Sequence, residues 1–179
     1  MDFARVLDAV TAFLDARGAR HALAGAFALH AYGRTRATSD LDLIVEASVQ
    51  APLLAFLEGL GYERLYGSKG FSNHLHADPA LGRLDFIYVD ARTADLLFGG
   101  ARRIELFPGR TSTVPRPEHL AAMKILAMKN DPARTFQELA DLQFLLGLPG
   151  IDKAEIRATF EKHGLAERFH ELERTITGS

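Results

Sequence analysis

The chain contains no cysteine and no apolar segment long enough to cross a bilayer. Without cysteine, disulfide bonds, thiolate zinc sites and cysteine nucleophiles are excluded, and a reducing compartment fits. The longest apolar runs, such as residues 22–29, fall well short of the ~20 residues that a transmembrane helix needs. Residues 1–5 lack the basic start of a signal peptide. The sequence therefore predicts a cytoplasmic protein with no membrane contact.

The chain also lacks a large excess of positive or negative charge. The 21 basic and 23 acidic residues give a net charge of -2, so no global positive field gathers polyanions, and nucleic acid would have to be held locally. With 47% hydrophobic and 25% charged residues, the composition is that of an ordinary globular protein. A chain of 179 residues buries roughly 70% of the surface that its unfolded state exposes. It can therefore fold on its core alone.

Hydrophobic periodicity changes along the chain near Pro115. Before it, strands and helices alternate, which predicts an α/β core over residues 1–114. After it, helical periodicity dominates, which predicts a helical C-terminal extension over residues 115–179, packed on the core. Helices are expected at residues 3–14, 26–32, 52–60, 119–128, 132–146, 153–163 and 165–176, and strands at 21–24, 41–45, 62–66, 71–76, 84–89, 103–107 and 111–114.

Two aspartates begin one of the expected strands. Asp40 and Asp42 are two residues apart, and side chains at i and i+2 of a strand share a face. Like charges that close repel, a cost that a bound cation offsets. Asp85 begins a second apolar strand and can join them from a neighbouring position in the sheet. Three carboxylates suit Mg²⁺ or Mn²⁺, although an isolated Asp-x-Asp is usually a solvated strand end.

A glycine ends the strand expected at residues 21–24. Gly25 directly precedes a helix, so its backbone can approach a ligand closely and the helix start can receive phosphate oxygens. Alone, Gly25-Ala26 is a common strand-to-helix turn. Beside the paired aspartates, it indicates that phosphate and metal sites lie together.

The combined pattern resembles the signature of the nucleotidyltransferase superfamily, which has the polymerase-beta-like fold. Gly25-Ala26 is followed after thirteen residues by Asp40-Leu41-Asp42, and later by Leu84-Asp85-Phe86. Arg36, Thr38 and Ser39 before the paired acids, and Lys124 followed by Arg134 and spaced acids, are similar to the AbiEii-type branch of toxin nucleotidyltransferases. The resemblance covers roughly residues 20–146 and implies a mixed sheet flanked by helices.

The resemblance implies transfer of a nucleoside monophosphate from an NTP to an acceptor, with release of pyrophosphate. Asp40, Asp42 and Asp85 would be the catalytic and metal-binding residues, with Asp85 activating the acceptor. Gly25, Ala26, Arg36, Thr38, Ser39 and Lys124 would bind the nucleotide phosphates. Glu138 and Asp141, one helical turn apart, are further candidates for the site and equally plausible as surface partners of Arg134.

The acceptor and partners stay open at this point. An RNA or tRNA end fits the toxin-like branch, which would also imply a cognate antitoxin, while a protein side chain or a small molecule such as an aminoglycoside is an alternative. The rival interpretation is a non-catalytic nucleotide-binding or partner-binding module on the same fold. Ala26, where the family usually has glycine or serine, is its only indication.

Overall fold

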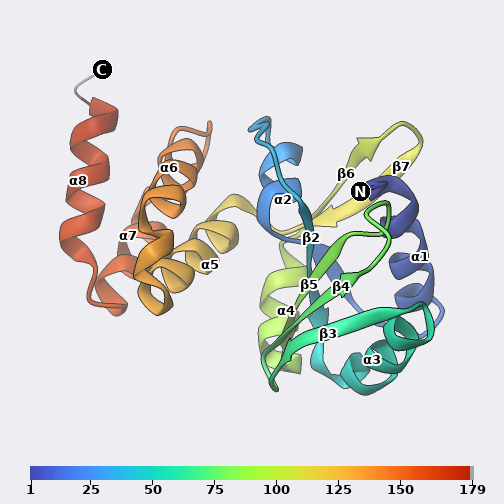
Figure 1. The fold of residues 1–179 in the computed structure, drawn as a ribbon. Helices are drawn as coiled ribbons and strands as arrows, with labels where there is room; N and C mark the ends of the chain where they lie inside the picture. Colours follow the sequence, from blue (N-terminus) through green and yellow to red (C-terminus); the bar gives the residue numbers. More distant parts are fainter. Residues whose placement is uncertain (178–179) are drawn as a thin grey trace. The chain divides into compact units, whose positions relative to one another are not determined.

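A five-stranded mixed sheet forms the centre of the first of two compact units, Met1–Pro115 (Figure 1). The computed structural model describes the backbone of residues 1–177 and the side chains of residues 1–175. Strands β2 and β5 pair in parallel at the middle of the sheet, and the other neighbours pair antiparallel. The strand order is β1 (His21–Leu23), β2 (Asp40–Glu46), β5 (Arg83–Val89), β4 (Phe71–His76) and β3 (Tyr62–Gly67).

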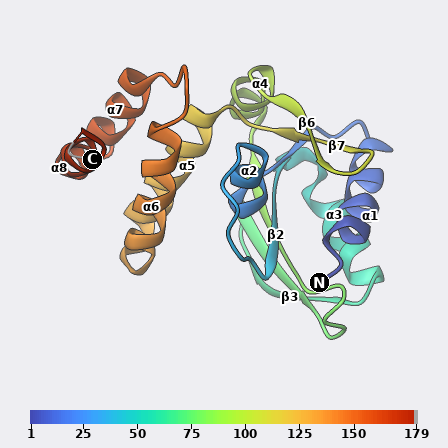
Figure 2. The same ribbon diagram turned by 90° about the horizontal axis from the view of Figure 1, so that it is seen from above.

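Helices cover both faces of this sheet. Helices α1 (Phe3–Asp15) and α3 (Gln50–Gly59) lie on one face, and α2 (Gly25–Ala31) and α4 (Ala91–Gly99) on the other (Figure 2). A short 3₁₀ turn, Ala47–Val49, leads from β2 into α3. The predicted α/β fold with a mixed sheet flanked by helices is confirmed.

A separate hairpin completes the first unit. Strands β6 (Arg102–Phe107) and β7 (Arg110–Val114) pair antiparallel around a turn at Gly109, whose φ of 73° suits glycine. The hairpin contacts β1 and α2 rather than joining the main sheet. Both strands agree with the sequence-based prediction.

Helix α4 is the element that the periodicity does not predict. Asp90 caps it by accepting a hydrogen bond from the Thr93 N–H at 2.7 Å. Only Ala94 and Leu97 of this helix are buried, while Leu96 is 63% exposed. The buried face of α4 is too narrow to give the sequence a clear helical period of hydrophobic residues, because a surface helix usually buries three or four residues per two turns.

The alternation of β2 separates the hydrophobic core from the acidic face. Leu41, Leu43 and Val45 are fully buried, whereas Asp40 and Asp42 are partly exposed on the opposite face. The acids therefore stand on a rigid central strand without entering the core.

The second unit, Arg116–Ser179, is helical. Buried apolar side chains of its helices form its core, with the rings of Phe160 and Phe169 packed 5.5 Å apart. Within residues 1–177, no helix is both long enough and apolar enough to traverse a membrane. The elements are α5 (Pro117–Asn130), a 3₁₀ turn (Pro132–Arg134), α6 (Thr135–Leu146), α7 (Lys153–Lys162) and α8 (Ala166–Thr177).

Candidate active site

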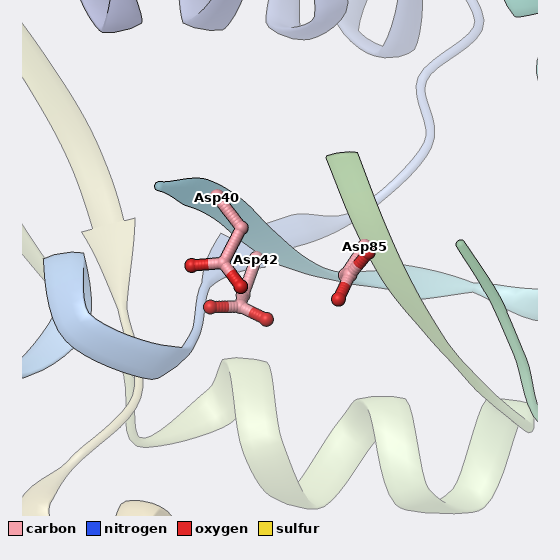
Figure 3. A group of neighbouring side chains, drawn as sticks. All are labelled: Asp40, Asp42 and Asp85. Atoms are coloured by element: carbon pink, nitrogen blue, oxygen red, sulfur yellow. The ribbon is translucent and has the colours of Figure 1, made fainter. Parts of the chain in front are cut away.

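The parallel pairing of β2 and β5 brings three predicted site residues together. Asp42 lies directly beside Asp85 in the register, and Asp40 stands two residues back on the same face. One carboxylate oxygen from each side chain lies within 4.8 Å of the others (Figure 3). Figure 3 shows the side chains on the side of the sheet where α2 and α4 lie. Residues 43 positions apart in sequence thus form one acidic cluster.

Gly25 lies directly against this cluster. Its φ is +52°, and a Cβ built on it would stand 1.9 Å from Asp42 Oδ2. The adjoining backbone is held in place because the Ala24 N–H donates to the Asp42 carbonyl at 2.9 Å. Both the left-handed conformation and the close approach require glycine here. The predicted proximity of the glycine turn and the paired acids is therefore present in the structure.

The segment before β2 contributes a hydroxyl to the cluster. Thr38 Oγ1 donates a hydrogen bond to Asp40 Oδ1, which orients that carboxylate. Arg36 is partly buried and Ser39 is exposed in the same irregular segment. Their predicted contact with phosphate stays a prediction.

Arg83 is the residue of this cluster that the sequence analysis missed. Its Nε and Nη2 donate to Asp85 Oδ1 and Oδ2 at 2.9 and 3.0 Å, a bidentate pair. The pKa of Arg83 is raised, first by this hydrogen bond with Asp85 and further by the charges of Asp85, Asp40 and Asp42. A signal existed in the sequence, because Arg83 and Asp85 are two residues apart on one strand and share a face.

The donor set fits a hard divalent cation. Mg²⁺ and Mn²⁺ prefer oxygen ligands, and each of Asp40, Asp42 and Asp85 offers a partly exposed carboxylate. The Gly25 backbone leaves the Asp42 carboxylate room that any side chain at position 25 would fill. The residues present are therefore suited to such an ion.

Lys124, Glu138 and Asp141 meet in the second unit. Lys124 Nζ lies 3.0 Å from Glu138 Oε2 and 2.6 Å from Asp141 Oδ2, and Arg134 Nη2 lies 2.6 Å from Glu138 Oε1. The side chains of Glu138 and Asp141 are only 1% exposed. The suggested pairing of Arg134 with Glu138 is present, although Glu138 is buried. The proposed phosphate contact of Lys124 stays a prediction.

Two further features of the first unit lie apart from the acids. A cavity of about 380 Å³ opens between α1, β1 and the β6–β7 hairpin, and none of the predicted site residues lines it. His74 is buried and lies 2.8 Å from Ser72 Oγ, which lies 2.7 Å from the Tyr88 hydroxyl. Burial lowers the His74 pKa, and Arg64 lowers it further while Asp85 opposes the shift.

Comparison with known proteins identifies the fold. No family model and no curated protein matches the chain. Among solved structures, the antibiotic-resistance factor ANT(2'')-Ia has a TM-score of 0.59 at 18% identity, over 99% of this chain and 94% of that one. A second structure of ANT(2'')-Ia contains adenylyl-2''-tobramycin.

Two further solved structures resemble this chain. An antigenic nucleotidyltransferase-like protein from Paracoccidioides brasiliensis has a TM-score of 0.61 at 15% identity, over 98% of this chain and 92% of that one. The lincosamide antibiotic adenylyltransferase LnuA, bound to lincomycin, has a TM-score of 0.50 at 12% identity, over 94% and 96% of the two chains. The chain therefore has a nucleotidyltransferase fold along nearly its whole length.

Proposed function

We propose that the protein is a divalent-metal-dependent nucleotidyltransferase, which transfers a nucleoside monophosphate from an NTP to an acceptor hydroxyl or phosphate. The observation that carries this proposal is the placement of Asp40, Asp42 and Asp85 on one face of two adjacent parallel strands. The nucleotidyltransferase fold supports it. The cytoplasmic location expected from the sequence would supply the NTP.

In this proposal the acids have two roles, metal binding and proton acceptance. Asp40, Asp42 and Asp85 would hold Mg²⁺ or Mn²⁺, which when bound supplies positive charge to the phosphoryl oxygens. Asp85 would accept the proton of an acceptor hydroxyl as its oxygen bonds to the α-phosphorus of the NTP. The bond from the α-phosphorus to the bridging oxygen breaks, and pyrophosphate leaves.

Polar groups around the acids would hold the triphosphate. The Gly25-Ala26 backbone lies beside Asp42, so phosphate oxygens bound near the metal would come within reach of its N–H groups. Arg36, Thr38 and Ser39 precede β2 and would add a cation and two hydroxyls. For Lys124, in the second unit, the family resemblance implies a phosphate contact, which would require its ammonium to leave Glu138 or Asp141.

For the acceptor, we propose a small hydroxyl-bearing molecule. Two of the similar structures are of the antibiotic-resistance factor ANT(2'')-Ia, in complex with adenylyl-2''-tobramycin, and of the lincosamide antibiotic adenylyltransferase LnuA. An RNA or tRNA end, with a cognate antitoxin as partner, is the alternative that the resemblance to the AbiEii-type branch favours. The net charge of -2 argues for the small molecule, since the chain has no overall positive field for RNA.

A label-transfer assay tests the activity and the acceptor together. The protein is incubated with each α-³²P-labelled NTP and Mg²⁺ or Mn²⁺, with tobramycin, lincomycin or total cellular RNA as acceptor. We expect metal-dependent transfer to one of the small molecules, abolished by chelator and by Asp42→Asn. Transfer to RNA alone would replace the proposed acceptor. NTP binding without transfer to any acceptor would instead favour the non-catalytic module.

A further inference from the structure

Arg83 places a positive charge directly beside the acids of the proposed metal site. It lies on β5 two residues before Asp85, so both side chains project from the same face of the sheet. Its guanidinium takes both oxygens of Asp85, at 2.9 and 3.0 Å. The Asp85 side chain is 18% exposed and that of Arg83 is 41% exposed. The pair is therefore accessible from solvent rather than buried in the core.

The register also places Arg83 beside a second acid, Asp40. Arg83 pairs with Asp40 across the parallel strands, as Asp85 pairs with Asp42. A guanidinium is a planar fork that matches a carboxylate with two parallel hydrogen bonds, which a lysine ammonium does not reproduce. Arg83 is thus both oriented toward Asp85 and electrostatically coupled to the whole cluster.

We propose that Arg83 is the built-in counter-cation of the acidic cluster and the positioning residue of Asp85. In the metal-free protein it offsets the repulsion among the carboxylates and fixes the orientation of the Asp85 carboxylate. A divalent ion held by all three acids would bind the same Asp85 carboxylate that the guanidinium holds, and the two cations would repel each other, so Arg83 and the ion compete. This inference rests on the metal site of the proposed function.

The competition predicts the direction in which Mn²⁺ affinity changes when Arg83 is replaced. Removing a unit positive charge about 5 Å from a divalent ion relieves repulsion that corresponds to roughly tenfold in affinity, even in a water-like dielectric. Arg83→Gln is therefore expected to bind Mn²⁺ about tenfold more tightly. Arg83→Lys keeps the positive charge but cannot form the two parallel hydrogen bonds to Asp85. Its Mn²⁺ affinity is therefore expected to lie between those of wild type and Arg83→Gln.

Arg20, the residue before β1, provides a control in the same unit. It forms a similar two-bond pair with Glu46 at the opposite end of β2, with donor–acceptor distances of 3.2 and 2.8 Å. Glu46 is not part of the acidic cluster. Arg20→Gln removes this pair together with the Arg20–Asp95 ion pair at 2.6 Å, and is expected to leave Mn²⁺ affinity unchanged.

The experiment is a Mn²⁺ titration without nucleotide, read by electron paramagnetic resonance, on wild type, Arg83→Gln, Arg83→Lys and Arg20→Gln. Melting temperatures in chelator and in saturating Mn²⁺ are the second readout. Arg83→Gln should melt below wild type in chelator and gain more from Mn²⁺ than wild type does. Equal or weaker Mn²⁺ binding by Arg83→Gln overturns the competition, and an unchanged melting temperature in chelator overturns the counter-cation role.

Failure of the proposed function gives a different pattern. If none of the four proteins binds Mn²⁺, the metal site of the proposed function is wrong, and the competition falls with it. If wild type binds Mn²⁺ and Arg83→Gln binds it equally, only the inference about Arg83 is wrong.

Discussion

The protein contains two ionic clusters that differ in composition and burial. The cluster on β2 and β5 brings three partly exposed carboxylates within 4.8 Å of one another, beside Arg83. The cluster formed by α5, the 3₁₀ turn after it and α6 pairs Lys124 and Arg134 with Glu138 and Asp141, and the side chains of these two acids are almost fully buried. Closely spaced, accessible carboxylates are suited to recruiting a further cation, whereas alternating buried charges already satisfy one another. The comparison supports the proposed metal site at the first cluster and a stabilising role for the second, whose buried contacts Lys124 would have to leave in order to bind phosphate.

The largest effect is expected from Asp42→Asn. Loss of one metal-binding carboxylate should lower label transfer by about a thousandfold, since metal stabilisation of phosphoryl charge is worth several kcal/mol and each 1.36 kcal/mol is tenfold. The melting temperature in chelator should not fall, because the substitution removes a like charge. Asp95→Asn on α4 is the control and should keep its activity. Near-normal transfer by Asp42→Asn would remove Asp42 from the metal site.

Lys124→Ala tests the second cluster. It leaves Glu138 and Asp141 buried without the ammonium between them, and breaking such a network typically costs about 3–5 kcal/mol of unfolding free energy. Lys129→Ala, at an exposed position of the same helix, should change stability by less than about 0.5 kcal/mol.

Denaturant unfolding of the two lysine variants checks this difference. Equal stability of Lys124→Ala and Lys129→Ala, with activity lost only in Lys124→Ala, would contradict the stabilising role. That result would make Lys124 primarily a phosphate ligand.

Gly25→Ala sharpens the comparison within the first cluster. Its Cβ would overlap the Asp42 carboxylate, and the positive φ adds about 1–2 kcal/mol of strain. Mn²⁺ affinity should fall because Asp42 must move. Gly33→Ala, at φ 98° with open space around its Cβ, controls for strain and should lower stability without changing Mn²⁺ affinity. Unchanged Mn²⁺ binding by Gly25→Ala would show that Asp42 does not depend on this contact.

The smallest effect concerns pH and His74. Burial lowers the His74 pKa in the folded protein, so the unfolded chain binds its proton more readily below about pH 6.5. The contribution of His74 to stability is therefore present above that pH and lost as the pH falls. Unfolding free energies at pH 7.5 and 5.5 should differ less in His74→Asn than in wild type. An equal pH dependence in both proteins would show that His74 is not held neutral.

Strand alternation explains why the sequence predicts the acidic cluster so well. Asp40 and Asp42 share a face by local geometry, and apolar periodicity identifies both central strands. The pairing of β2 with β5 is non-local, so local patterns do not specify it. The sequence analysis predicts that Asp85 can join Asp40 and Asp42 from a neighbouring position in the sheet, and the register confirms this.

The sequence predicts less where packing decides the outcome. Arg83 has several acids within reach of its flexible side chain, and only the folded sheet shows that it takes Asp85. Lys124 meets Glu138 and Asp141 because α5 packs against α6, which no local pattern specifies. Helix α4 escapes prediction because it buries only two side chains.

A crystal of the protein grown with Mn²⁺ and a non-hydrolysable NTP analogue tests the central claim most directly. Anomalous scattering at a wavelength that excites manganese locates the ion independently of activity. We predict a peak among the carboxylates of Asp40, Asp42 and Asp85, with the triphosphate beside Gly25. Bound nucleotide without manganese at these acids, or manganese bound only at Glu138 and Asp141, would contradict the account.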